Sequence, residues 1–215
     1  MAAPSLLSFI RQNLPLTAVP SVPEIRLHTA HSGSGLRRIE QHGKENAAPY
    51  WAYPWAGGMT LARYILDHPQ SVRGRHVLDL GAGSGLVAIA TAKAGAGSVL
   101  AAEIDRNALA ALELNLTENA ASATVIDQDI IDGEPPAVDL VLVGDLFYEP
   151  RLAKRVTAFL DRCVAAGIEV LVGDLGRKDL PLSRLRLLAE YPVTDFGDAK
   201  GAQTRPGRVF SFEHA

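Results

Sequence analysis

The chain has 215 residues, of which 47% are hydrophobic and 21% are charged, and its formal net charge is −3. This length fits one α/β domain with a substantial core and is short for two, while the composition excludes disordered and fibrous chains. The single cysteine, Cys163, excludes a disulfide framework, and the twelve acids against two bases in residues 77–150 argue against nucleic acid as a partner.

The N-terminal residues predict a small appendage ahead of the main domain. Residues 3–13 have the apolar spacing of a short amphipathic helix, and the prolines that follow enforce an extended path. Alternating apolar residues and a Gly-Ser-Gly turn predict a hairpin within residues 24–40. The first residues lack a basic stretch followed by a long apolar one, which argues against secretion. We therefore expect a cytoplasmic protein, or a mitochondrial matrix protein in a eukaryote.

Aromatic residues are concentrated just upstream of the main domain. Both tryptophans and two of the five tyrosines lie within residues 50–55, before a helix that we expect over residues 59–67. This cluster could plug the core, or it could form an aromatic wall around a bound cation, and both interpretations can hold together. We expect residues 1–58 to form the N-terminal extension with this aromatic segment, and residues 59–215 to form the main domain.

A strand, a glycine-rich loop and a helix follow one another directly from residue 76. A second apolar run, residues 98–102, ends in an acid and completes a βαβ unit of the kind that holds an adenosine-containing cofactor. A dinucleotide-binding loop would carry glycine where Leu86 stands, so the spacing D-x-G-x-G-x-G argues against a dinucleotide. The residues of this unit that we expect to bind the cofactor are Asp79, Gly81, Gly83, Gly85 and Glu103.

The D-x-G-x-G-x-G loop resembles motif I of the class I S-adenosylmethionine (SAM) methyltransferases. SAM offers an ammonium, a carboxylate and a sulfonium in place of a pyrophosphate. Asp79 suits the ammonium, the loop amides suit the carboxylate, and Glu103 suits both ribose hydroxyls. The resemblance also implies an adenine contact after the strand expected at residues 124–126, where Asp129 is the candidate. A helix cap or loop acid is the alternative interpretation of Asp129.

The second half of the chain alternates between predicted strands and helices. The apolar run 138–144 is typical of a buried parallel strand. Because the carboxyl ends of parallel strands face the ligand crevice, Asp145 and Tyr148 should point into it. The other elements expected are helices over 106–119, 150–165 and 180–189, a strand over 168–173, and a hairpin of 191–196 with 208–213. The chain thus predicts an α/β, Rossmann-like, seven-stranded and mostly parallel sheet with helices on both faces and a C-terminal antiparallel hairpin.

Two motifs together narrow the resemblance. The D-x-x-Y motif that begins at Asp145 and the Trp-rich residues 51–58 are similar to those of the seven-β-strand protein lysine methyltransferases, in particular the electron transfer flavoprotein β-subunit lysine methyltransferase family. The resemblance implies methyl transfer from SAM to a lysine, with that flavoprotein subunit as the expected partner. It implies catalytic roles for Asp145 and Tyr148, with Asp145 also contacting the cofactor. The expected aromatic contacts are Trp55 with the cofactor, and Trp51, Tyr53 and Phe147 with the substrate.

Two other functions stay open at this point. A small-molecule amine N-methyltransferase would be served equally well by an acidic site, and a non-catalytic SAM-binding or dinucleotide-binding module would need only the glycine loop. The six histidines show no metal-ligand spacing, and no apolar stretch is long and unbroken enough to span a membrane. We expect no metal, no membrane association and a monomer.

Overall fold

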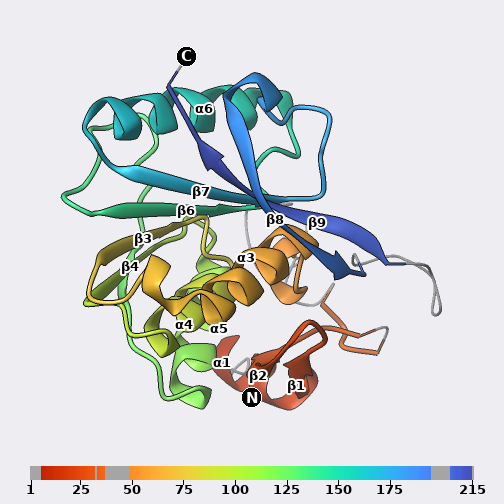
Figure 1. Cartoon of the computed structure of the whole chain (residues 1–215). Helices are drawn as coiled ribbons and strands as arrows, with labels where there is room; N and C mark the ends of the chain where they lie inside the picture. Colours follow the sequence, from red (N-terminus) through yellow and green to blue (C-terminus); the bar gives the residue numbers. More distant parts are fainter. Residues whose placement is uncertain (1–5, 32, 37–48, 195–203, 215) are drawn as a thin grey trace.

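The computed structural model describes residues 6–31, 33–36, 49–194 and 204–214 (Figure 1). Its helices are α1 (Leu6–Asn13), α3 (Ala56–Asp67), α4 (Leu86–Lys93), α5 (Arg106–Glu118) and α6 (Pro150–Ala165), with the 3-10 turns η1 (Tyr50–Ala52), η2 (Pro69–Ser71) and η3 (Leu182–Arg184). Its strands are β1 (Leu16–Val19), β2 (Val22–His28), β3 (His76–Leu80), β4 (Ser98–Ala102), β5 (Thr124–Ile126), β6 (Leu140–Gly144), β7 (Glu169–Asp174), β8 (Leu185–Val193) and β9 (Arg205–Phe212). The observed bounds of β3, β4, β5 and α6 are the predicted ones.

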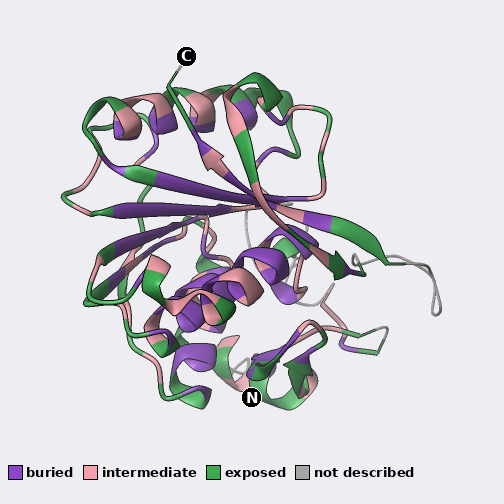
Figure 2. Ribbon diagram, in the orientation of Figure 1, coloured by how far each residue is buried: buried purple, intermediate pink, exposed green. Residues whose placement is uncertain are grey.

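One seven-stranded sheet organises the main domain, in the order β5-β4-β3-β6-β7-β9-β8. The five neighbouring strands β5, β4, β3, β6 and β7 run parallel to one another. Strand β9 pairs antiparallel with β7, and β8 pairs antiparallel with β9 at the edge of the sheet. Figure 2 shows β6 and β7 buried along most of their length, as expected of apolar strands covered on both faces. The predicted fold class is confirmed, including the antiparallel hairpin at the C-terminus.

Helices cover both faces of this sheet, with α3 and α4 on one side and α6 on the other (Figure 1). Their apolar sides form two core clusters, one that includes Leu61 and Ile89 and one that includes Phe159. Pro150 is the first residue of α6, and the Glu149 carboxylate accepts two hydrogen bonds from amides of its first turn. A cap and a proline therefore set the start of α6 locally, directly after the loop that leaves β6.

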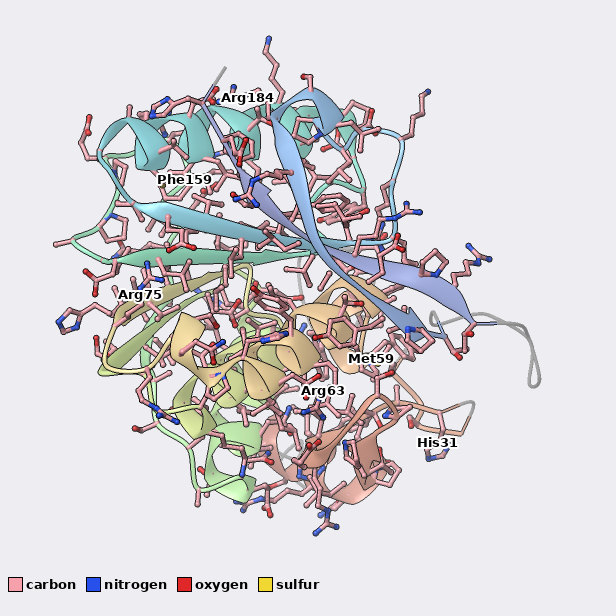
Figure 3. All side chains as sticks on the ribbon, in the orientation of Figure 1. His31, Met59, Arg63, Arg75, Phe159 and Arg184 are labelled. Carbon is pink, nitrogen blue, oxygen red and sulfur yellow. The ribbon has the colours of Figure 1, made fainter. Side chains whose placement is uncertain are left out.

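The N-terminal segment packs on α5 through α1 and β2. Strands β1 and β2 form an antiparallel hairpin that turns at residues 20–21, earlier than predicted. The predicted position of the turn is wrong. Residues 16–19, which the sequence predicts only as an extended path between prolines, form β1 and pair with β2. Residues 37–48 lie outside the described part of the chain. Arg63 of α3 lies toward this hairpin and pairs with Glu24 of β2 at 2.7 Å (Figure 3).

The helix predicted over residues 180–189 is wrong. The chain forms the short turn η3 there and then the edge strand β8, which pairs with β9 along its whole length. The apolar residues suit a helical period, but Leu187 is 49% exposed, so they do not form one buried face. Pairing with β9 overrides local propensity at this edge. The predicted terminal hairpin is confirmed, although its first strand begins earlier than residue 191.

Candidate active site

A cavity of about 1690 Å³ lies at the carboxyl ends of the parallel strands. Ligand pockets usually measure about 300 to 1,000 Å³, so this one has room for a cofactor and a second group. The predicted site residues that line it are Trp51, Tyr53, Trp55, Asp79, Gly81, Gly83, Glu103, Asp129, Asp145 and Tyr148. The structure therefore brings together ten side chains or loop positions that lie far apart in the sequence.

The glycine loop bends sharply and lies against the loop after β6. Gly81 has φ of 70°, and a Cβ atom there would lie 2.7 Å from Leu146. Gly85 has φ of 88°, and a Cβ atom there would lie 2.5 Å from Leu112 of α5. Gly85 does not line the cavity, so its place in the pattern is explained by the close approach of α5. The contact of Gly81 with Leu146 brings the D-x-x-Y loop directly beside the glycine loop.

Asp79 is a buried acid of β3 that bonds to the first turn of α4. Its side chain is inside the protein, the residue being 2% exposed, and Oδ2 accepts a hydrogen bond from the amide of Ala88 in the first turn of α4 at 2.9 Å. Burial raises the pKa of Asp79 to about 7, with the Ala88 amide opposing the rise and the charge of Glu103 adding to it. An acid in such a place gains from a cationic partner, which is the chemistry that an ammonium group offers.

Glu103 follows β4 and holds the glycine loop from the other side. Its Oε2 accepts from the amide of Gly83 at 2.8 Å, and its Oε1 accepts from the amides of Ile104 and Asp105 at 2.7 and 2.8 Å. A carboxylate has about four acceptor positions, so three are engaged by backbone. Ribose hydroxyls would therefore share this carboxylate with the loop, or replace the Gly83 contact.

Asp129 lines the cavity, but its oxygens are engaged by other groups. Oδ2 pairs with Arg155 of α6 at 2.9 Å, and Oδ1 accepts from the amide of Ile131 at 3.2 Å. Arg155 also pairs with Asp132 and lines the same cavity. These contacts fit a loop acid that also lines the cavity, and the contact of Asp129 with adenine stays a prediction.

Asp145 occupies a constrained position directly after β6. Its φ is 60°, in the left-handed region that residues other than glycine seldom adopt, and its amide donates to the carbonyl of Gly173 at 3.1 Å. Oδ2 accepts from the amide of Gly58, in the first turn of α3, at 2.6 Å, and Oδ1 forms an ion pair with Arg177. Burial raises the pKa of Asp145, while the Arg177 charge and the Gly58 amide oppose that rise.

Arg177 is a site residue that the sequence did not reveal. It follows β7, whose last residue, Asp174, is fully buried, and it lines the cavity. Its Nη1 contacts Asp145 and lies 3.1 Å from Oδ2 of Asp174. The rule that carboxyl ends of parallel strands face the crevice could have identified this residue, because β7 is the parallel neighbour of β6.

Aromatic rings form a continuous rim at the cavity. Tyr148 lies 5.5 Å from Tyr50 between ring centroids, Tyr50 lies 5.8 Å from Trp55, and Trp55 lies 6.3 Å from Tyr53. Tyr50 and Tyr148 are each 51% exposed, so the rim faces both solvent and cavity. Burial of the phenol, together with nearby Tyr50 and acids, raises the pKa of Tyr148, which keeps it a hydrogen-bond donor at neutral pH.

Two aromatic residues have other environments. Trp51 is buried beside α1 and α5, yet it lines the cavity, and its indole Nε1 has no hydrogen-bond partner in the described part of the chain. An orphan donor of this kind fits a ligand acceptor such as a carboxylate. Phe147 is fully buried in the core cluster of Phe159 and does not line the cavity, so this placement supports packing and not the predicted substrate contact.

The described residues offer neither a metal-binding cluster nor a membrane-spanning helix. Across residues 6–31, 33–36, 49–194 and 204–214, no three His, Cys, Asp or Glu side chains gather in a way that could hold a metal ion. Within the same ranges, every helix is too short or too polar for a bilayer span.

The chain resembles known proteins in sequence and in fold. A family model described as ribosomal protein L11 methyltransferase (PrmA) matches residues 61–146. The chain is 37% identical to the electron transfer flavoprotein beta subunit lysine methyltransferase of Xenopus laevis, over 96% of this chain and 86% of that protein. It is 38% identical to the human protein of the same name, over 98% of this chain and 83% of that protein. The solved structure of TrmN from Thermus thermophilus, 20% identical, matches in fold with a TM-score of 0.54 over 86% of this chain and 55% of that one.

Proposed function

Because this chain belongs to the family of electron transfer flavoprotein β-subunit lysine methyltransferases, we propose that its substrate is a lysine of that flavoprotein subunit and that SAM is its methyl donor. The chain is a protein lysine methyltransferase, as the similarity over nearly its full length establishes. The observation that supports the site most directly is the contact of Leu146 with Gly81, because it brings the D-x-x-Y loop and the glycine loop to one cavity.

The residues of the cavity fit SAM in charge and in hydrogen-bonding capacity. When bound, SAM supplies an electrophilic methyl group on a sulfonium. Asp79 would hold its ammonium, and Glu103 would accept from its ribose hydroxyls. The unpartnered indole of Trp51 and the loop amides would donate to its carboxylate. Trp55 would face its cation with an aromatic surface, and Asp129 would lie nearest its adenine.

The chain's own residues would orient the substrate amine. Asp145 is held by the amide of Gly58 and keeps acceptor positions free, so a lysine N–H can donate to it. Tyr148 would border the same amine from the rim. Lysine has a reference pKa of about 10.4, so holding it neutral at pH 7 costs about 4.6 kcal/mol. Desolvation by Trp51 and Tyr53 and repulsion by the sulfonium both favour the neutral form.

A protein substrate is favoured over a small amine by the relatives and by the rim. The relatives described above are named as protein methyltransferases. The rings of Tyr50 and Tyr148 are half exposed, so they are accessible to a lysine presented on a protein surface. We also propose that residues 1–58 form the segment that borders substrate and cofactor, and that residues 59–215 bind SAM. A monomeric state and a cytoplasmic location, or the mitochondrial matrix in a eukaryote, stay predictions.

The test is methylation of purified electron transfer flavoprotein β-subunit with labelled SAM, followed by mass spectrometry of its lysine peptides. We expect label on lysine with the unaltered chain, and a loss of about 100-fold in rate with Asp145→Ala, because the amine loses the acceptor that orients it. Asp67→Ala is the matched control, since Asp67 pairs with Arg63 of α3 and does not line the cavity. Label on small amines but on no protein would instead support the small-molecule alternative.

A further inference from the structure

Arg177 is held against Asp145 by the loop that follows β7. Gly144 and Gly173 are register partners, so Asp145 and Asp174 leave neighbouring strands at the same edge. Oδ1 of Asp174 accepts from the amides of Gly176 and Arg177 at 2.7 and 2.8 Å, which wraps the loop around this buried carboxylate. The guanidinium is thereby directed to Asp145, and its side chain is only 21% exposed.

The charges in this cluster leave one negative charge unbalanced. Asp145 and Asp174 share the single guanidinium of Arg177. Arg208 of β9 approaches the same loop near Gly176, but it pairs with Glu190. The cavity is also lined by other ionisable side chains, namely Tyr50, Tyr53, Tyr148, Asp79, Glu103, Asp105, Asp129, Arg106 and Arg155. From α3, the amide of Gly58 faces Asp145.

An unpaired Asp145 would work against methyl transfer. A lone buried carboxylate favours the ammonium form of a nearby lysine, which has no free electron pair and cannot attack a methyl group. A carboxylate whose charge is offset can still accept a hydrogen bond from a neutral amine. It then orients the amine without stabilising the proton that must leave.

We propose that Arg177 offsets the charge of Asp145 and so keeps the substrate amine in its neutral, nucleophilic form, with the proton lost to water. This inference rests on the proposed lysine methylation. Arg177 acts through Asp145 and through its own charge, so it is a positioning residue and not a reacting one. A guanidinium stays protonated at any physiological pH, which makes this offset independent of pH.

The test is the pH dependence of the single-turnover methylation rate, at saturating SAM and flavoprotein β-subunit. For Arg177→Gln we expect the midpoint of the rising limb to move up by about one pH unit, with the rate about tenfold lower at pH 7 and recovered at high pH. Arg177→Lys keeps the charge and should keep the midpoint. Arg186→Gln, which removes an exposed pair with Glu213, is the control for loss of an arginine.

Folding of the variant is controlled by a second substitution. Arg177→Gln leaves Asp174 buried without its cation, whereas the double variant Asp174→Asn with Arg177→Gln removes both charges and keeps an acceptor for the two loop amides. We expect the midpoint of the double variant to rise too, but by less than that of Arg177→Gln, because the charge of Asp174 is also removed. A loss of rate that is equal at every pH, or a midpoint that does not move, would show that Arg177 is only structural and overturn the inference.

A second measurement does not depend on turnover. Calorimetry of substrate binding, with a non-transferring SAM analogue that keeps a positive charge at the position of the sulfonium and in buffers of different ionisation enthalpy, counts the protons released. At the pH of the kinetic midpoint of the unaltered chain, we expect more protons to be released per bound lysine by the unaltered chain than by Arg177→Gln, because free lysine is protonated there. Equal release by the two proteins would overturn the inference. Absence of any methylation of the flavoprotein subunit would instead contradict the proposed substrate.

Discussion

At the scale of single residues, three of the acids that line the cavity share one property. Asp79, Glu103 and Asp145 each accept a hydrogen bond from a backbone amide at the start of a helix or within the glycine loop. Each acid therefore has a structural role in addition to the proposed one, and its position is defined by the fold. Ligand groups would meet carboxylates whose orientation is already set, which reduces the entropy lost on binding.

Asp79 predicts a pH dependence of SAM binding. The pKa of this acid rises from 3.8 to about 7 in the folded chain, so near pH 7 it is half protonated, whereas a bound ammonium favours the ionised form. Affinity for SAM should therefore fall about tenfold per pH unit below pH 7 and be constant just above it. Calorimetric titration of the protein with SAM, at several pH values between about 5.5 and about 7.5, measures this change in affinity.

Asp79→Asn is the matched variant. Its amide oxygen can still accept from Ala88, so the fold should persist, while binding should be weaker at pH 7.5 and lose its pH dependence. The stability of the ligand-free protein should change with pH in the opposite direction to the affinity for SAM. An acid with a raised folded-state pKa stabilises the protein below its unfolded pKa, and that stability is lost as pH rises toward 7. Identical pH dependences of binding in both proteins would contradict the role given to Asp79.

At the scale of elements, glycines allow α3 to approach the sheet. A Cβ atom at Gly57 would lie 2.3 Å from the carbonyl oxygen of Gly173 and 2.7 Å from Cγ of Asp145. A Cβ atom at Gly144 would lie 3.1 Å from Gly58 Cα. Packing thus explains the two glycines of the Trp-Ala-Gly-Gly sequence, whatever the role of its tryptophan. They let α3 come close enough to the sheet for the amide of Gly58 to reach Asp145.

Substitution of the two adjacent glycines should have opposite effects on stability. Gly57→Ala should lower the free energy of unfolding by about 3 kcal/mol, because the new methyl overlaps backbone that cannot move freely. Gly58→Ala meets its nearest atom at 3.8 Å and should be neutral or stabilising by up to about 1 kcal/mol, as alanine favours a helix. Urea unfolding of both variants measures the two changes in the free energy of unfolding. Equal losses of stability in the two variants would contradict the packing argument.

Asn115 of α5 and Asn119, the C-terminal cap of that helix, connect the N-terminal hairpin to the site. Asn119 exchanges hydrogen bonds with the backbone of Arg26 through both its side-chain atoms. Asn115 accepts from the amide of His28 at 2.8 Å and donates to the carbonyl of Ser84, in the glycine loop, at 2.9 Å. The side chains of a helix thus satisfy polar groups of β2 that would otherwise be buried without partners.

Asn115→Ala should destabilise the fold and loosen the glycine loop. Two buried backbone groups lose their partner, at about 1 to 3 kcal/mol each. Thermal unfolding measures the loss of stability, and hydrogen exchange measures opening of the loop at Ser84 and Gly85. Thr117→Ala is the control on the same helix, since its hydroxyl bonds only within an exposed turn. Unchanged exchange at the loop would contradict the connection.

At the scale of the whole molecule, the N-terminal segment shares the core of the main domain. Val19, Val22, Ile25 and Leu27 are buried in the same cluster as residues of α3, α4 and α5. Burial of four such side chains contributes on the order of 8 kcal/mol, which is comparable to the total stability of a typical domain. The hairpin therefore supports the helices that border the cavity.

Removal of residues 1–48 should abolish cooperative folding. The truncated chain would expose the apolar sides of α4 and α5 and lose the partners of Asn115 and Asn119. We expect circular dichroism without a sigmoidal thermal transition, and aggregation in place of monomeric elution. The full chain under the same conditions is the control. A truncated chain that unfolds cooperatively would show that residues 49–215 fold independently.

The sequence alone determined the elements whose signals are local. Gly81, Gly83 and Gly85 stand between an apolar run and an acid, and a proline opens α6. Such signals affect only the few residues around them, so the sequence predicts β3, β4, β5 and α6 with their observed bounds. The alternation of these elements was sufficient for the fold class and for the edge at which the acids gather.

Only the tertiary structure decided the rest. Residues 180–189 form an edge strand because β9 offers it hydrogen bonds, and Phe147 turns into the core because α6 covers it. The ion pair of Arg177 with Asp145 depends on the register of β6 with β7. Local periodicity carries no information on which distant strand or side chain completes a contact, so these partners had to be observed.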